Sequence, residues 1–300
     1  MSNGDFAQLF QTAVESEGDE YIAARGAILA MGEAVRPQIA VKLDATDWRE
    51  QLVAQIVAGW MDHGSLFEQV TAKVRGIPER SLTLKPISKT YAPSQRARAL
   101  VAMGVDVVPR LLEMLLKSKD HPGLAEMQAI MQALNAFNDS RAVLPLADLA
   151  GQDIQEPART FALGALGKFR DPRTFATVES IFADMENSAG VRSSAAVALG
   201  LFADRRATSR LLSALQDPTE DEEVRRYAAR GLGYLGDPAA SDALAAMLRS
   251  EQPPEMALTL VHALSSLGGS TAIAALEETG RSHSDESIRQ AAEGARRMLA

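Results

Sequence analysis

The side chains that could do chemistry in this chain are few, and their spacing forms no recognisable catalytic set. The histidines stand alone, next to Gly, Pro, Ala and Ser, at His63, His121, His262 and His283. No serine has a histidine and an acidic partner at a recognisable spacing. The chain has no cysteine, so disulfides, thiolate metal ligands and cysteine nucleophiles are absent. We therefore expect no catalytic, cofactor-binding or metal-binding residues.

Acidic clusters and a glycine pair could also suggest chemistry, but they fit structural roles better. Asp221–Glu223 and Glu277–Glu278 could bind a cation or act as an acid and a base. Such groups are more typical of solvated helix surfaces and of acid-rich first turns, which the helix dipole favours. Gly231 and Gly233 follow no predicted strand, so they lack the context of a nucleotide-binding loop. The sequence favours a non-enzymatic role.

The composition and charge of the chain limit the cellular compartments and the classes of partner that we expect for it. The formal net charge is −8, which disfavours nucleic acid as a general partner, because phosphate contacts need clustered Lys and Arg. The first 20 residues carry five acidic side chains and no apolar run, unlike a secretory signal. No apolar stretch approaches the roughly 20 residues that span a bilayer. We expect a cytoplasmic protein without membrane insertion, whose partner is another protein.

A sequence pattern repeats along the chain, and the elements it predicts must position any functional residues. The segment 198–217 reads as the end of one helix, a turn at Asp204 and a second helix. Similar segments recur at spacings of 32, 33, 33 and 32 residues, with turns at Asp139, Asp171, Asp204, Asp237 and Gly269. A fixed period of this size indicates stacked helical hairpins, none of which buries its apolar face alone.

The period predicts an all-α solenoid: a single domain over 1–300, a right-handed superhelix of about eight helix pairs. Helix 5–16 is expected to cap the N-terminal end, and helix 285–300 the C-terminal end. The second pair, 47–75, should break at Asp62 or Ser65. Each second helix places Leu or Val at one column, which we expect to be core: Leu146, Val178, Leu211, Leu244 and Leu276.

The turn residues of the repeat have a structural interpretation. A carboxylate at the start of a helix accepts backbone N–H bonds and meets the positive end of the helix dipole. Asp139, Asp171, Asp204 and Asp237 are expected to cap the second helices in this way. Arginines follow two residues later, and we expect each to bond a carboxylate or carbonyl of a neighbouring repeat, as a ladder through Arg141, Arg173 and Arg206.

One insertion interrupts the repeats at residues 76–94. It contains three prolines and cannot run as helix. Seven cations and one anion lie between Lys73 and Arg98 in a chain that is acidic overall. Long insertions of this kind are either functional or disordered, and both readings stay open. The cations that could bind a partner here are Lys73, Arg75, Arg80, Lys85 and Lys89.

Residues 191–207 and 224–240 carry the pattern Val-Arg, paired Ala, Leu-Gly and a closing Asp. These stretches resemble HEAT repeats, and more narrowly the short HEAT-like repeats named after phycobilisome lyases. The resemblance implies that second helices line the concave face and first helices the convex one. That family includes scaffolds, adaptors, chromophore lyase subunits and a few enzymes. Deoxyhypusine hydroxylase, a di-iron HEAT-repeat enzyme, relies on paired His-Glu motifs, and this sequence has none.

Two hypotheses follow. In the first, the chain is a scaffold that binds a protein partner through its concave face and also through the basic 76–94 insertion. The candidate residues for this contact lie on the second helices, near the core column described above. They are Glu179, Leu212, Asp242 and Glu277. In the second, which rests on the family resemblance alone, the chain is a bilin lyase subunit that attaches or detaches a chromophore on an antenna protein.

Overall fold

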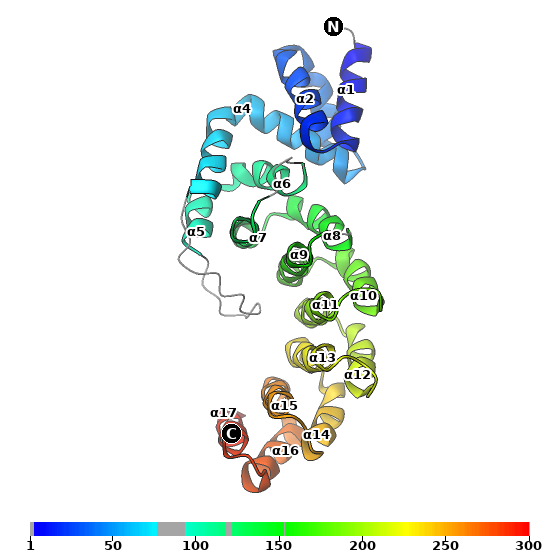
Figure 1. Cartoon of the computed structure of the whole chain (residues 1–300), viewed down its shortest axis with the longest axis vertical. Helices are drawn as coiled ribbons and strands as arrows, with labels where there is room; N and C mark the ends of the chain where they lie inside the picture. Colours follow the sequence, from blue (N-terminus) through cyan, green and yellow to red (C-terminus); the bar gives the residue numbers. More distant parts are fainter. Residues whose placement is uncertain (1–2, 77–93, 118–121, 153, 300) are drawn as a thin grey trace. The chain divides into compact units, whose positions relative to one another are not determined.

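The computed structural model describes residues 3–76, 94–117, 122–152 and 154–299, and these residues fold entirely into helices, turns and loops (Figure 1). The part of the chain described here contains α-helices and short 3-10 helices and no β-strand. This confirms the prediction of an all-α repeat fold. The chain divides into two compact units, Met1–Ala165 and Leu166–Ala300, each built from consecutive helical hairpins.

The first unit begins with a hairpin, continues through one long kinked helix and ends with further hairpins. The 3-10 helices Gly32–Val35, Val105–Val107 and Ser140–Ala142 lead into α3, α6 and α8. Its helices are α1 (Asn3–Glu15), α2 (Gly18–Ala30), α3 (Arg36–Leu43), α4 (Trp48–Gly76), α5 (Gln95–Val101), α6 (Val108–Leu116), α7 (Leu124–Phe137), α8 (Val143–Gly151) and most of α9 (Glu156–Phe169).

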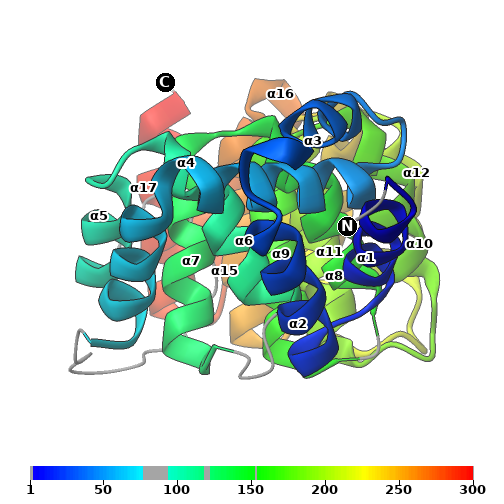
Figure 2. The ribbon, with the colours of Figure 1, turned by 90° about the horizontal axis from the view of Figure 1, so that it is seen from above.

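Helix α1 lies beside α2 and also contacts α4 (Figure 2). Its rings Phe6 and Phe10 point inwards and are 5% and 1% exposed. They form one apolar cluster with Tyr21 and Ile28 of α2 and with Val53 of α4. Burying a side chain of this size contributes about 1.5–3 kcal/mol. Helix α1 therefore packs its apolar face on the first repeats, and its role as an N-terminal cap stays a prediction.

Helix α4 contains the break expected in the second pair. His63 has non-helical backbone angles, with φ −133° and ψ 30°, so the two halves of α4 fold against each other. Phe67 of the second half packs on Gly59 of the first, where an added Cβ would lie 2.8 Å from Cε2 of the Phe67 ring. Trp60 meets Phe67 edge to face at 5.3 Å. The break, predicted at Asp62 or Ser65, thus falls at His63, one of the two residues between them.

The second unit repeats one hairpin with little variation. The 3-10 helices Pro172–Thr174 and Pro238–Ala240 lead into α10 and α14. The residues predicted as a core column in this unit, Val178, Leu211, Leu244 and Leu276, are all fully buried. Its helices are α10 (Phe175–Ala183), α11 (Ala189–Phe202), α12 (Ala207–Gln216), α13 (Glu222–Leu235), α14 (Ser241–Arg249), α15 (Pro254–Leu267), α16 (Gly269–Ser282) and α17 (Glu286–Leu299).

Within Leu166–Ala300 the helices form two rows that bend together. Figure 1 shows α11, α13, α15 and α17 on the inner side of this bend and α10, α12, α14 and α16 on the outer side. First helices therefore line the inner side, which corrects the expectation that second helices do so. Small residues explain the difference, because a Cβ on Gly200 of α11 would lie 2.6 Å from the Cα of Gly231 in α13. Because α11 and α13 approach so closely, the row of first helices is shorter than the row of second helices and lies on the inner side of the bend.

Helix α17 closes the C-terminal end. Asp285 caps it, accepting the backbone N–H groups of Ser287 at 2.7 Å and Ile288 at 3.3 Å. Ile288 and Ala292 are fully buried against α15 and α16, whereas Arg296 and Arg297 lie on the polar side of the helix. Helix α17 thus has one apolar face towards the repeats and one polar face, the pattern from which a capping helix was predicted.

Candidate partner-binding surface

The four turn aspartates bond the start of the helix that follows them. In each case a carboxylate oxygen accepts the backbone N–H two residues later, at 2.9–3.2 Å. In three of the four turns, at Asp139, Asp171 and Asp237, the bonded N–H belongs to a short 3-10 helix that leads into the second helix. A cap of this type contributes about 0.5–2 kcal/mol, so these residues set the hairpin geometry rather than a binding site.

The arginines after these aspartates were predicted to bond carboxylates or carbonyls of neighbouring repeats, but their main ion pairs lie within their own turns. Each guanidinium folds back onto the carboxylate of its own turn: Arg141 onto Asp139 at 2.6 Å, Arg173 onto Asp171 at 2.7 Å and Arg206 onto Asp204 at 2.6 Å. The backbone turn that brings N–H and carboxylate together also places the side chain two residues on within reach. The hydrogen bond from Arg173 lowers the pKa of Asp171 below its ordinary value.

Neighbouring repeats are linked by other contacts at the same turns. Thr208 of α12 donates its hydroxyl to Asp237 of the next turn at 2.6 Å, and both side chains are buried. The guanidinium of Arg206 lies 4.2 Å from the centre of the Phe175 ring in the preceding repeat. Of the predicted arginines, Arg141 alone reaches a neighbouring carbonyl among the described residues, that of Val105 at 3.3 Å.

The candidate residues on the second helices of the second unit lie on its outer row, and each belongs to a different helix. Glu179 is half-buried and 3.8 Å from Arg210 of the next second helix. Asp242 accepts a hydrogen bond from Thr271 of α16 at 3.2 Å. Glu277 pairs with Arg281 one turn on, and Leu212 is half-buried. The structure does not gather these side chains into one site. Glu179 and Asp242 each contact the next helix of the outer row, whereas Glu277 pairs within α16.

The basic candidates fall in two groups. Lys73 and Arg75 are exposed in the last turns of α4. Arg80, Lys85 and Lys89 lie outside the described residues, as do the remaining residues of the 77–93 segment. The expectation that this insertion contacts a partner therefore stays a prediction.

The inner row carries a set of aromatic and basic side chains that sequence reasoning did not select. Tyr227, Arg230 and Tyr234 follow one face of α13 at spacings of three and four residues, and all three are half-buried. The Arg230 Nε donates to the Tyr234 hydroxyl at 3.0 Å. Its guanidinium lies 5.8 Å from the centre of the Tyr227 ring and 5.6 Å from that of Tyr234. Arg230 is thus held between two rings.

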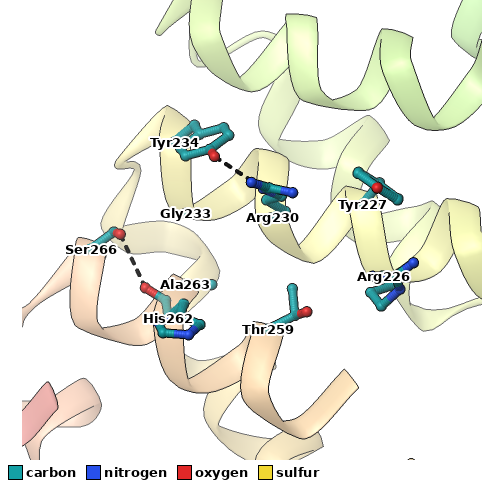
Figure 3. Close-up of a pocket in the computed structure, with 9 residues that line it drawn as sticks. All are labelled: Arg226, Tyr227, Arg230, Gly233, Tyr234, Thr259, His262, Ala263 and Ser266. Atoms are coloured by element: carbon teal, nitrogen blue, oxygen red, sulfur yellow. Dashed lines mark hydrogen bonds between the residues drawn. The ribbon is translucent and has the colours of Figure 1, made fainter. Parts of the chain in front are cut away.

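A pocket of about 400 Å³ lies between this face of α13 and the neighbouring face of α15 (Figure 3). Gly233 and Ala263 are its smallest lining residues, and they bring the two helices together: a Cβ on Gly233 would lie 2.8 Å from the Cα of Ala263. Longer side chains stand around them, from α13 on one side and α15 on the other. The remaining lining residues are Arg226, Tyr227, Arg230, Tyr234, Thr259, His262 and Ser266.

The sequence did carry a signal for this pocket. Tyr227, Arg230 and Tyr234 occupy the repeat positions of Ser194, Val197 and Leu201 one repeat earlier. His262 takes the place of Arg230 one repeat later. At these three repeat positions the residue type changes strongly from one repeat to the next, whereas the adjacent packing positions keep the same residues. Packing between the helices alone therefore does not determine which residues occupy the three positions.

A second pocket, of about 390 Å³, lies in the first unit and has a different character. Asp47, Asp148, Glu15 and Glu17 line it, and its cations are already engaged. Arg49 pairs with Asp148 at 2.6 Å and stacks on Trp48. Lys117 donates to the backbone carbonyls of Val14 and Ser16, each at 2.8 Å, and burial lowers its pKa. Its polar groups mainly hold α1 against the repeats.

The most enclosed polar cluster of the first unit surrounds Glu113 of α6, which is 2% exposed. The Glu113 carboxylate accepts the Tyr21 hydroxyl and the Trp60 Nε1–H, each at 2.9 Å, and pairs with Arg110 at 2.6 Å and with Arg25. Burial, and then the Glu113 charge, raise the pKa of Tyr21 well above its ordinary value. Sequence reasoning missed this cluster, since its partners lie on three helices.

The described part of the chain holds no group of three or more His, Asp or Glu side chains placed to bind a metal ion. His63 lies at the kink of α4, and the ring of His283 accepts the backbone N–H of Asp285 at 3.1 Å. His121 lies outside the described residues. No described helix has the length and hydropathy of a membrane span.

Comparison with known proteins identifies the repeats. Residues 208–296 match the family model for HEAT repeats, and residues 191–217 match that for the PBS lyase HEAT-like repeat. The predicted resemblance is thereby confirmed for this part of the chain, which carries HEAT repeats. No curated protein sequence matches the chain.

Three solved structures are similar in part. Human deoxyhypusine hydroxylase in complex with glycerol is 18% identical over 80% of this chain and 98% of its own, with a TM-score of 0.34. The E. coli protein YibA is 16% identical over 87% and 92%, with a TM-score of 0.47. The CpcE–CpcF complex of phycocyanin lyase from Nostoc sp. PCC7120 is 20% identical over 87% and 93%, with a TM-score of 0.40. Likenesses of this degree say nothing about the activity of this chain.

Proposed function

We propose that this protein is a repeat scaffold that binds a partner protein on the inner side of its second unit, at the surface formed by α13 and α15. The observation that carries the proposal is the row Tyr227–Arg230–Tyr234 beside a pocket of about 400 Å³. The previous repeat has Ser, Val and Leu at these positions, so stacking the helices does not require tyrosine and arginine there.

The residue types support binding energetically. Tyrosine and arginine are enriched among the residues that dominate the free energy of protein interfaces. A tyrosine offers a large contact area and has only two side-chain torsions to order on binding. Contacts of Arg230 with both rings already restrict these side chains before a partner arrives. Preordered side chains reduce the entropy that binding must overcome.

The basic stretch that begins in the last turns of α4 and continues through the 76–94 insertion is a second element of this proposal. Its described residues on α4, Lys73 and Arg75, are exposed. In an acidic chain such a cluster would attract an acidic partner over a distance of roughly one Debye length, about 8 Å at physiological salt. Deleting residues 77–93 and measuring partner recovery tests this element separately. Unchanged recovery would remove the segment from the proposal.

The main test compares inner and outer variants as baits. Tagged wild-type protein, the variant Tyr227→Ala/Tyr234→Ala and the outer-row variant Leu212→Ala/Glu277→Ala are incubated with a lysate of the source cells. Co-purifying proteins are then quantified by mass spectrometry. We expect the same partner with wild type and the outer-row variant, and at least a tenfold lower recovery with the tyrosine variant.

Circular dichroism and the urea midpoint of each bait establish that the variants fold. The opposite pattern, with recovery lost only in the outer-row variant, would place binding on α10, α12, α14 and α16. Equal recovery with all three baits would reject both surfaces and, with them, the proposed role of the tyrosines.

A bilin lyase subunit is the second candidate, and one observation favours it: residues 191–217 match the PBS lyase HEAT-like repeat. This repeat type is defined by its packing residues, and a repeat fold hosts many functions. Incubation with phycocyanobilin separates the two candidates. A scaffold leaves the absorbance spectrum of the pigment unchanged, whereas a lyase-like protein shifts it.

A further inference from the structure

The charge of the α13–α15 pocket is opposite to that of the chain as a whole. Its lining includes the guanidinium groups of Arg226 and Arg230 and no carboxylate. The whole chain has a formal net charge of −8. A concave site lined by two cations and no carboxylate favours negatively charged ligands, because the ligand then provides the charge that neutralises the two guanidinium groups.

The two arginines are not equally available. Arg226 has an acidic neighbour, Glu255, whose carboxylate is 79% exposed and 3.7 Å away. At that distance and exposure the pair contributes at most about 1 kcal/mol. Arg230 forms no ion pair with any described residue, and its hydrogen bond to the Tyr234 hydroxyl uses Nε. Its two terminal nitrogens are therefore the groups that a ligand can approach.

The environment of Arg230 orients those nitrogens. The Tyr234 hydroxyl fixes the Nε edge at 3.0 Å, and the rings of Tyr227 and Tyr234 lie within 6 Å of the guanidinium centre. Figure 3 shows Arg230 and Tyr227 on α13 facing the same space as Thr259 and His262 on α15. A planar guanidinium held at one edge presents a fork, which matches the two oxygens of a carboxylate.

The hydroxyl groups on the α15 side do not compete for this role. Thr259 donates its hydroxyl to the backbone carbonyl of Glu255 at 2.8 Å, and Ser266 donates to that of His262 at 3.0 Å. Both protons are already committed within the helix. Recognition of an anion in the pocket therefore falls to the guanidinium groups, with His262 at the exposed rim.

We infer that this pocket binds an aspartate or glutamate side chain of a partner protein, with the carboxylate on the free edge of Arg230 and the adjoining residue against Tyr227 and Tyr234. The inference rests on the proposed function and specifies the chemistry of the partner. Because Arg226 already pairs with Glu255, the pocket has about one positive charge left to balance, and one ligand carboxylate provides it. A nucleic-acid backbone requires a longer basic track.

A selection experiment tests the inference without knowledge of the partner. A random 12-residue peptide library displayed on phage is selected on the full wild-type chain, on Arg230→Gln and on Arg249→Gln. Arg249 is the matched control, because it lies on α14 in the outer row and pairs with Glu278 at 2.7 Å. We expect enrichment of Asp and Glu with wild type and Arg249→Gln, and loss of that enrichment with Arg230→Gln.

Titration of one enriched peptide by fluorescence anisotropy gives the magnitude. Replacing its acidic residue by the corresponding amide, or Arg230 by Gln, should weaken binding about tenfold or more, the effect of losing one charge-assisted bidentate contact. Arg230→Lys should restore only part of the affinity, because the charge returns without the fork. Full affinity with Arg230→Gln would overturn the inference.

Two further outcomes discriminate against other ligands. A labelled single-stranded 12-nucleotide DNA that binds more tightly than the peptide, and loses that affinity with Arg230→Gln, would overturn the inference in favour of nucleic acid. Partner recovery that depends on Tyr227 and Tyr234 but not on Arg230 would also overturn it, while leaving the proposed scaffold function intact. The failure of the inference is thereby distinguishable from the failure of the function.

Discussion

The indole Nε1 of Trp60 lies 2.9 Å from Oε2 of Glu113, so the first half of α4 is tied to α6 through a carboxylate that is 2% exposed. Tyr21 donates to the other oxygen of Glu113 at 2.9 Å. One buried carboxylate therefore joins three helices that lie up to 92 residues apart in the chain. Two arginines, Arg25 and Arg110, balance its charge.

Glu113→Gln should destabilise the first unit. The substitution keeps the shape of the side chain but removes the charge that Arg25 and Arg110 face, and leaving buried charges unpaired costs about 3–5 kcal/mol. We expect a lower free energy of unfolding, by about 3 kcal/mol, in urea titrations followed by Trp fluorescence. Glu278→Gln is the control, since its carboxylate is exposed and pairs with Arg249, and it should change stability by less than about 1 kcal/mol. Equal effects would show that the cluster is not a stabilising centre.

Gly200→Ala should separate α11 from α13. The added methyl group would lie 2.6 Å from the Cα of Gly231, which is backbone and cannot move aside as a side chain can. Overpacking of this kind costs about 1–3 kcal/mol. Gly294→Ala in α17 is the matched control, because nothing lies within 4 Å of its Cβ and alanine favours helix by up to about 1 kcal/mol. Thermal unfolding should therefore shift downwards for Gly200→Ala and slightly upwards for Gly294→Ala. Similar shifts in both variants would contradict the close packing of the inner row.

Asp237 should contribute to a loss of stability in acid. Its hydrogen bonds with the Thr208 hydroxyl and the Ala239 N–H lower the pKa of Asp237 below the ordinary value. A lowered folded-state pKa stabilises the protein above the unfolded pKa of about 3.9. That contribution is lost as the pH falls through the folded-state value.

The pH dependence can be measured from urea midpoints at pH 7, 5 and 3.5. We expect the fall between pH 5 and 3.5 to be smaller in Asp237→Asn than in wild type. At pH 7, Thr208→Val should cost about 1 kcal/mol, the typical net value of one hydrogen bond. Parallel pH profiles for wild type and Asp237→Asn would show that this contact between repeats does not depend on the charge.

The repeat could be predicted from the sequence because its determinants are local. The turn aspartates recur every 32 or 33 residues, and each caps the turn that immediately follows it. The column Val178, Leu211, Leu244 and Leu276 is buried because an apolar residue at one phase of a helix must face the neighbouring helices. The kink of α4 could also be predicted, because Asp62 or Ser65 could start a second helix within residues 47–75.

Features that depend on packing between repeats could not be predicted in the same way. Which row lies on the inner side depends on how closely α11 and α13 approach, and Gly200 shows this only when Gly231 is seen opposite it. The Glu113 cluster depends on contacts between residues 53 and 92 positions apart. Arg173 and Arg206 bond within their own turns rather than in the predicted ladder, because a turn residue reaches the carboxylate two positions away before it reaches a neighbouring repeat. Arg141 bonds its own turn and also the Val105 carbonyl of the preceding repeat.

Site-specific photo-crosslinking tests the central claim most directly. The photoreactive residue p-benzoylphenylalanine replaces Tyr227 on the inner row in one variant and Leu212 on the outer row in another. Both positions are half-buried, so both probes sit at the protein surface. Irradiation in the source cells should link the inner-row variant to one discrete partner protein and give no such product from the outer-row variant. Crosslinks from Leu212 and none from Tyr227 would contradict a binding surface on α13 and α15.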